Sequence, residues 1–281
     1  MTDLPSYVGR QEVQRDYSDS GRMARLAATL DHVSPPWRAD VIPPLGHWLC
    51  FTPSERQSRI GADGHPVRTD DGLLPNVDLP RRMWAGSRIM FVDDIAVDVP
   101  IIRTSTLVSA TPKSGRSGEM LFVTVKHEIA REGGPVAIVE EQDIVYREAA
   151  DTSATFVRAG EEPGEPDPII RSVTPDPVML FRYSALTFNS HRIHYDRDYA
   201  RAEEGYPSLV IHGPLLATLL IDHLVRQVPD KRIRSYRFRA ASPLLEGDTV
   251  ELGLKLEGER ADLRAIGPFG IGMTATAEIA A

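Results

Sequence analysis

The stretch HGPLLATLLIDHLVRQVP, residues 212–229, decides how the chain folds. Its apolar residues cover nearly the whole circumference of a helix, which predicts a helix buried on most sides. Pro214 suits the first turn, where a backbone N–H is not needed, and Pro229 ends the helix. Strand-like runs follow at residues 232–242, 248–258, 261–267 and 270–280. A buried helix followed by antiparallel strands predicts a sheet wrapped around that helix.

A similar order of elements occurs in the first half of the chain. Residues 19–33 predict a helix, because Met23, Leu26, Ala27 and Leu30 recur at helical spacing and Asp19 or Ser20 can cap it. Strand-like runs follow at residues 87–99, 101–112, 119–132 and 133–148, with hairpin turns at 114–118 and 132–134. Short turns make neighbouring strands antiparallel.

The two halves together predict an α+β protein built from two helix-plus-sheet units. The first unit covers residues 1–150 and the second covers residues 171–281. Residues 151–170 are rich in Ala, Glu, Pro and Gly, which predicts an exposed linker. About 50 residues before position 86 are rich in Pro and Gly and lack periodicity, so this long loop is either functional or contains elements that the pattern hides.

The composition excludes several classes of protein. The 281 residues carry 40 acidic and 32 basic side chains, a net charge of −8, which disfavours a nucleic-acid partner. Cys50 is the only cysteine, so neither an intrachain disulfide nor a thiolate metal cluster can form. The N-terminus lacks the features of a signal peptide, and no apolar run is long enough to span a bilayer. We therefore expect a cytoplasmic protein with no membrane partner.

Polar residues of catalytic type gather in FRYSALTFNSHRIHYDRDYA, residues 181–200, and in GYPSLVIHGPLL, residues 205–216. Three of the eight histidines lie between positions 191 and 212, directly before the buried helix. Such a density of titratable groups beside the most buried element indicates a site.

The segment TFNSHRIHYD, residues 187–196, resembles the S-G-D-x-N-P-I-H-x-D pattern of the MaoC-like or hydratase-2 family. Residues 204–215 and 79–91 resemble the branch that contains mitochondrial-type 3-hydroxyacyl-thioester dehydratases and itaconyl-CoA and mesaconyl-CoA hydratases. The resemblance implies a double hotdog fold, in which the unit over 1–150 is non-catalytic and the unit over 171–281 carries the catalytic loop. Asn189 stands where the family has Asp, and His191 stands where it has Asn.

The resemblance implies a hydro-lyase that adds water reversibly to the 2,3 double bond of an enoyl thioester. This reaction needs a base, an acid and donors for the enolate oxygen. His194 is the expected base, and it carries both proton transfers unless water or a second histidine shares them. Asn189 cannot ionise, so we expect its amide to orient the water. Gly213 opens the buried helix, and its N–H is the candidate oxyanion donor.

Other residues are candidates for substrate binding, each with a structural alternative. His191 either binds substrate or holds the loop, and His212 either binds substrate or caps the helix. Arg192 either binds a distal carboxylate, contacts a CoA phosphate or pairs with Asp196. Arg182, Arg81 and Arg82 are further cations of this kind, and Trp84 is either a substrate wall or part of the core.

We expect no cofactor or metal, with CoA present only as part of the acyl-CoA substrate. A zinc site of His191, His194, Asp196 and His212 lacks a strict ligand motif. The expected substrate is a short dicarboxylyl-CoA such as itaconyl-CoA or mesaconyl-CoA, which would give citramalyl-CoA. The alternatives are a 3-hydroxyacyl-ACP or -CoA dehydratase of lipid or polyketide synthesis, an acyl-CoA thioesterase and a non-catalytic acyl-CoA-binding protein. A homodimer or another homo-oligomer is compatible with each of these functions.

Overall fold

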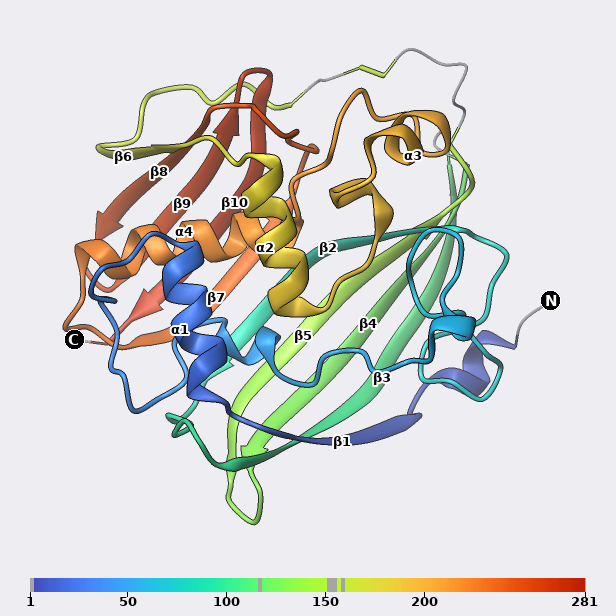
Figure 1. The fold of residues 1–281 in the computed structure, drawn as a ribbon, viewed down its shortest axis with the longest axis horizontal. Coiled ribbons are helices and arrows are strands. Elements are labelled where there is room, and N and C mark those ends of the chain that lie inside the picture. The colour runs from blue at the N-terminus through green and yellow to red at the C-terminus, as the bar shows by residue number, and fades with distance from the viewer. Residues whose placement is uncertain (1–2, 116–117, 151–155, 158–159, 281) are drawn as a thin grey trace.

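The computed structural model describes residues 3–115, 118–150, 156–157 and 160–280. Ten strands form one antiparallel sheet in the order β1-β3-β4-β5-β2-β7-β10-β9-β8-β6, with the helices packed against it (Figure 1). The strands of the first half are β1 (Gln11–Tyr17), β2 (Arg81–Phe91), β3 (Pro100–Gly115), β4 (Gly118–Arg131) and β5 (Val136–Arg147). Those of the second half are β6 (Ile169–Val173), β7 (Ile233–Ala240), β8 (Val250–Glu257), β9 (Arg260–Gly267) and β10 (Gly270–Ile279).

The helices are α1 (Ser20–Thr29), α2 (Pro177–Thr187), α3 (Arg197–Ala202) and α4 (Gly213–Gln227). Short 3-10 helices cover Leu4–Tyr7, Gly46–Leu49, Gln57–Arg59 and Arg192–His194. Among the described residues, no helix is long and apolar enough to cross a membrane.

Helix α4 is the centre of the C-terminal core. Every residue from Leu215 to Val225 is buried, and the helix packs against β8, β9 and β10 (Figure 1). Each fully buried leucine side chain contributes about 1.5–3 kcal/mol. Asp222 is also buried on this helix, where its carboxylate pairs with His32, Arg171 and Arg226 at 2.6, 2.9 and 2.9 Å. The two arginines compensate for the removal of the Asp222 charge from water.

The pairing of β2 with β7 joins the two halves into one sheet. Gly86 lies opposite Arg239 in this pairing, and a Cβ at Gly86 would lie only 2.3 Å from the Phe238 carbonyl oxygen. Glycine therefore permits the two strands to approach closely where the halves meet.

The predicted helices and most predicted strands are confirmed. Asp19 caps α1 as expected, because its carboxylate accepts hydrogen bonds from the N–H groups of Gly21 and Arg22. The strand predicted over 87–99 is wrong at both ends, since β2 begins at Arg81 and ends at Phe91. The turn at 132–134 is confirmed, whereas part of the turn predicted at 114–118 lies outside the described residues.

The sequence did not predict several elements, among them β1, β6 and α2. β1 is an edge strand that pairs only with β3, and most of its side chains are exposed, so it lacks an apolar alternation. β6 lies at the opposite edge of the sheet. In α2 the apolar residues Val178 and Phe181 are exposed, so the helix lacks a clear amphipathic pattern. Asp176 caps this helix, because its side chain accepts from the Met179 N–H.

The irregular chain before β2 and the predicted linker both lie against the sheet. Leu73, Leu74, Val77 and Leu79 pack on a cluster formed by β3, β4 and β5. In the described part of the linker, Gly160 donates to Phe269, and Arg264 of β9 binds Asp167 at 2.8 Å. The division of the chain at residues 150 and 171 stays a prediction.

Candidate active site

The loop between α2 and α3 carries the predicted site. Helix α2 ends with Phe188 in the left-handed region at φ 50°, and the Asn189 N–H donates to the Ser184 carbonyl. The Asn189 Oδ1 then accepts from the His191 N–H at 3.0 Å, which folds the chain into a tight turn. Asp196 accepts from the Tyr199 N–H and caps α3. Hydrogen bonds local to the chain therefore shape the loop over residues 189–194, here called the catalytic loop.

His194 is buried, with 7% of its surface exposed. Its Nδ1 lies 2.7 Å from the Val210 carbonyl oxygen, and since a carbonyl can only accept, Nδ1 carries the proton. The lone pair of the neutral ring is therefore on Nε2. Burial, together with the nearby His212 and His191, holds the pKa of His194 well below its usual value. The ring is accordingly an uncharged base at neutral pH.

His212 lies directly before α4 and stacks on His194, with ring centroids 3.7 Å apart and an interplanar angle of 20°. Its Nε2 lies 2.8 Å from the Ser184 Oγ, and its buried Nδ1 has no partner among the described residues. Burial and His191 lower the pKa of His212 to about 3. His212 is the N-cap residue of α4, as one of the two sequence-based interpretations has it, although its side chain makes no capping hydrogen bond.

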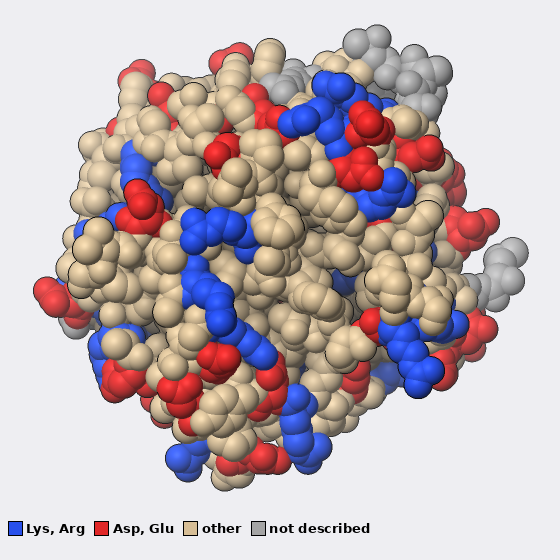
Figure 2. Space-filling model, in the orientation of Figure 1, with Lys and Arg blue, Asp and Glu red and all other residues tan. Residues whose placement is uncertain are grey.

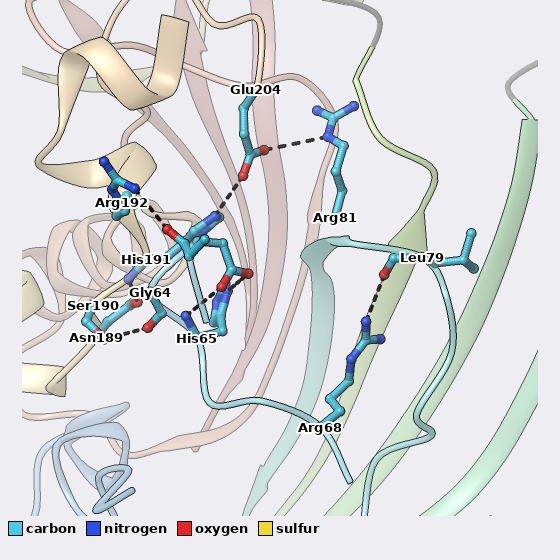
Figure 3. A network of polar contacts seen from close by, with 12 residues as sticks. Gly64, His65, Arg68, Leu79, Arg81, Asn189, Ser190, His191, Arg192 and Glu204 are labelled. Carbon is cyan, nitrogen blue, oxygen red and sulfur yellow. Dashed lines mark hydrogen bonds and ion pairs between the residues drawn. The ribbon is translucent and has the colours of Figure 1, made fainter. Parts of the chain in front are cut away.

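His191 links the catalytic loop to β2 through a carboxylate. Its Nε2 lies 3.0 Å from Glu204 Oε1, and Glu204 Oε2 lies 3.6 Å from the Arg81 Nε. Figure 3 shows Glu204 between His191 and Arg81. Arg81 also donates to the Tyr206 hydroxyl at 3.2 Å. His191 therefore holds the loop, as one of the two sequence-based interpretations has it, while its substrate-binding role stays a prediction.

The structure adds a histidine that the sequence analysis did not select. His65 lies in the long loop before β2, and its ring centroid is 4.2 Å from that of His191. The His191 centroid is in turn 5.4 Å from that of His194. Together with His212, these rings form a continuous row of four, here called the imidazole row. His65 precedes His191 by 126 residues in the sequence, and the segment GADGHP (residues 61–66) carries no periodic signal.

Gly64 brings this loop against the catalytic loop. It has φ +92°, and a Cβ there would lie 1.8 Å from the Ser190 carbonyl oxygen. The Ser190 Oγ donates to the Gly64 carbonyl at 2.5 Å, in the contact drawn in Figure 3. Both the positive φ and the close contact require glycine.

Gly213 lies at the start of α4, next to His212 in the imidazole row. The first intrahelical bond runs from the Leu216 N–H to the His212 carbonyl, so the Gly213 N–H precedes the helical ladder. A Cβ at Gly213 would have its nearest neighbours at 3.9 and 4.0 Å, on Trp84 and Met273. Such a Cβ would be in ordinary van der Waals contact with both residues, and the role of the Gly213 N–H as an oxyanion donor stays a prediction.

The remaining candidates have partners of their own. Arg192 binds Asp196 Oδ2 through Nε and Nη2, at 3.0 and 2.7 Å, and donates to the Ala62 carbonyl. Of the three roles considered for Arg192 from the sequence, the structure therefore shows the pairing with Asp196. Trp84 donates to Gly86 and Ser87 and packs on Trp48 and Phe238, so it belongs to the aromatic core beneath β2 and β7. Arg182 is exposed on α2. Substrate contacts of all three stay predictions.

Asp63, His65 and His191 are the described residues with the best geometry for a metal ion, because their ligand atoms lie within 4.8 Å of one another. Hydrogen bonding already satisfies them, since His65 Nδ1 lies 2.9 Å from Asp63 Oδ2 and His191 faces Glu204. Asp196, which belonged to the zinc set considered from sequence, is engaged by Arg192 and Tyr199.

The ten-stranded sheet, whose two halves join along β2 and β7 and whose C-terminal half packs on the buried helix α4, has the arrangement of the double hotdog class of proteins. The family model for hydroxyacyl-thioester dehydratase type 2 matches residues 45–246. The chain belongs to this family, and the resemblance inferred from sequence is confirmed.

Curated relatives agree with this assignment. Mesaconyl-C(4)-CoA hydratase of Chloroflexus aurantiacus is 44% identical over 281 residues, which cover 99% of this chain and 98% of that protein. The mitochondrial hydroxyacyl-thioester dehydratase type 2 of Schizosaccharomyces pombe is 24% identical and covers 88% of this chain and 90% of its own. The chain is therefore a lyase of the hydratase and dehydratase class.

Solved structures show the fold. A MaoC-like dehydratase superposes with a TM-score of 0.73 at 15% identity, covering 98% of this chain and 99% of its own. HtdX of Mycobacterium tuberculosis gives 0.68 at 19% identity, with 95% and 99% covered. A second M. tuberculosis protein, described as a double hotdog, gives 0.55 at 12% identity, with 97% and 96% covered. The predicted double hotdog fold is confirmed.

Gly64→Ala should lower kcat by about tenfold or more, because displacing the catalytic loop by even 1 Å misaligns the base. Gly133→Ala is the matched control, since Gly133 also has positive φ (+75°) but a Cβ there meets nothing within 4 Å. Both variants should lose roughly 1–3 kcal/mol of stability from backbone strain, measured by thermal unfolding. Equal kcat values for the two variants would contradict a role for the Gly64 contact.

Proposed function

We propose that the protein hydrates the 2,3 double bond of a short dicarboxylyl-CoA, mesaconyl-CoA, to citramalyl-CoA. The observation that carries the proposal is the His194 imidazole, which is buried and neutral, has its lone pair on Nε2 and stacks against the residue before α4. The 44% identical mesaconyl-C(4)-CoA hydratase supports the choice of acyl group.

The geometry supports a stepwise proton transfer. His194 Nε2 removes a proton from water while the water oxygen bonds to C3 of the enoyl group. The electron pair of the double bond moves through C2 onto the thioester oxygen, which the Gly213 N–H stabilises. The imidazolium then returns the proton to C2, and the carbonyl re-forms. One water is consumed, and the base is regenerated.

Asn189 is the proposed water-positioning residue. Its Oδ1 already accepts from the His191 N–H, which holds the amide beside the catalytic loop. The Nδ2 group is left to donate to the water oxygen, and the second lone pair of Oδ1 can accept from the same water. An amide orients water in this way without competing for its proton.

The anionic ends of the substrate need cations. Figure 2 shows Lys and Arg side chains in a band across the face that carries α1 and α2, although the chain as a whole is acidic. Arg25 on α1 and Arg182 on α2 are both exposed. Because Arg81 and Arg192 are engaged by Glu204 and Asp196, we favour Arg182 and Arg82 for the phosphates or the distal carboxylate.

A second candidate substrate is a monocarboxylic 3-hydroxyacyl thioester carried by CoA or ACP, as the fission yeast relative suggests. A panel of enoyl esters, followed by the loss of enoyl absorbance and by mass spectrometry, distinguishes the two. Preference for mesaconyl-CoA over crotonyl-CoA by a factor of ten or more in kcat/KM supports the proposal. The reverse preference contradicts it. Release of free CoA thiol would instead indicate a thioesterase.

His194→Ala should lower kcat by about 10²–10⁴-fold, because the proposed reaction loses its proton-transfer group. His127→Gln, on β4, serves as the control for loss of a partly buried histidine. Initial rates of hydration and melting temperatures are measured for both variants. Substantial turnover in a folded His194→Ala protein would refute the assignment of the base.

Asn189→Ala should lower kcat by about tenfold or more while KM changes little, because the amide acts on water rather than on the ester. Steady-state kinetics on the preferred ester measure the two constants separately. A large increase in KM with an unchanged kcat would make Asn189 a substrate-binding residue instead.

We also propose that the reaction uses no metal cofactor and that the protein works as a cytoplasmic homodimer. Dialysis against EDTA should leave kcat/KM unchanged, since imidazole and backbone groups supply the chemistry. Loss of activity on dialysis that returns with a divalent cation would point to a metal at Asp63, His65 and His191 instead. Sedimentation at assay concentration measures the oligomeric state.

A further inference from the structure

The loop over residues 61–66 is attached to the catalytic loop largely through its backbone. The Arg192 N–H donates to the Asp63 carbonyl at 2.9 Å, and the Arg192 side chain donates to the Ala62 carbonyl at 3.0 Å. The Ser190 hydroxyl donates to the Gly64 carbonyl. Within the loop itself, the Gly61 N–H donates to the His65 carbonyl at 2.7 Å. These bonds use carbonyl groups of the loop, so docking does not require the side chains of Asp63 and His65.

The side chains of Asp63 and His65 instead form a polar pair, in which His65 is the end member of the imidazole row. His65 Nδ1 lies 2.9 Å from Asp63 Oδ2, and a carboxylate can only accept, so Nδ1 carries the proton and Nε2 carries the lone pair. Asp63 Oδ1 also accepts from the His65 backbone N–H at 3.0 Å. Burial opposes ionisation of Asp63, but hydrogen bonding by His65 lowers the pKa of its carboxyl to about 2. Burial lowers the pKa of His65 to about 4.

The pair places a negative charge and a fixed tautomer at one end of the row. His65 contacts His191 at a centroid distance of 4.2 Å, and His191 contacts His194 edge to face at 5.4 Å. The proposed base becomes positive when it takes the proton from water. Asn189 is an amide and supplies no charge to balance it, whereas Asp63 and Glu204 each bind a histidine of the row.

We propose that Asp63 and His65, from the N-terminal half, are positioning residues of the hydratase site. Asp63 fixes the tautomer of His65, and the His65 ring orients His191 beside His194. This inference rests on the proposed hydration, and it makes the N-terminal half a contributor to catalysis rather than a non-catalytic unit.

Asp63→Asn tests the role of the charge and the tautomer while it keeps the shape of the side chain. The Asn amide can donate to His65 Nδ1, which moves the ring proton to Nε2. We expect kcat to fall by about tenfold or more with little change in KM. His65→Phe keeps a ring against His191 but loses the hydrogen bond to Asp63, and it should show the same pattern. Asp78→Asn, an exposed acid of the same long loop, is the control and should match the wild type.

The outcomes separate this inference from the proposed function. If the wild type and Asp78→Asn hydrate mesaconyl-CoA but Asp63→Asn and His65→Phe do so equally well, the inference is overturned and the proposed function stands. Unchanged melting temperatures with reduced kcat support it, because a merely structural pair would be replaced adequately by Asn. A lower melting temperature that accompanies the loss of active protein would instead show that the pair is structural.

An NMR measurement that needs no turnover tests the same inference, and it can be made even if no ester of the panel is hydrated. In ¹⁵N-labelled protein, long-range ¹H–¹⁵N spectra report the tautomer of each imidazole. The cross-peaks of His65 and His191 should move in Asp63→Asn and remain in place in Asp78→Asn. Cross-peaks of His191 that are identical in the wild type and Asp63→Asn would overturn the coupling between the pair and the row.

Discussion

The contact between the His194 and His212 rings is the interaction on which the site depends. His212 is the residue directly before α4, so the ring of His194, which lies on an irregular loop, packs against the start of a helix that is buried from Leu215 to Val225. The Gly213 N–H belongs to the same helix terminus. The proposed base and the proposed oxyanion donor are therefore positioned by one element, as proton transfer and enolate stabilisation on a single thioester require.

Burial and neighbouring histidines disfavour the protonated forms of three rings of the imidazole row, those of His65, His194 and His212. Two adjacent imidazolium ions at stacking distance would repel each other strongly, and burial removes the water that would screen them. The low pKa values of His65 and His212, about 4 and 3, reflect this environment. Each ring is instead fixed by a neutral or carboxylate partner, namely Asp63, Glu204, the Val210 carbonyl or the Ser184 hydroxyl. His65, His194 and His212 are therefore neutral rings at neutral pH.

A single chain with two hotdog halves allows the halves to differ. The C-terminal half has the long buried helix α4, whereas the N-terminal half contributes α1 and the short 3-10 helix Gly46–Leu49 to the same core. A long irregular segment follows that short helix, and its residues 61–66 reach the catalytic loop (Figure 3). In a dimer of identical halves, any such loop would occur twice. In this chain the N-terminal half can have a loop that contacts the site, because that half does not have to form a second site of its own.

Local sequence determined the buried helix, the antiparallel strands and the catalytic loop, because apolar periodicity, turn residues and capping groups act over a few neighbouring residues. The resemblance of residues 187–196 to a family pattern indicated Asn189 and His194, whereas Gly213 was indicated by its place at the start of the buried helix. Only the tertiary structure decided that Asp63, Gly64 and His65 face His191, that Glu204 lies between His191 and Arg81, and that Arg192 is engaged by Asp196 and Ala62. These contacts join residues up to 130 positions apart. They depend on how the two halves of the sheet join along β2 and β7, and no local pattern encodes that geometry.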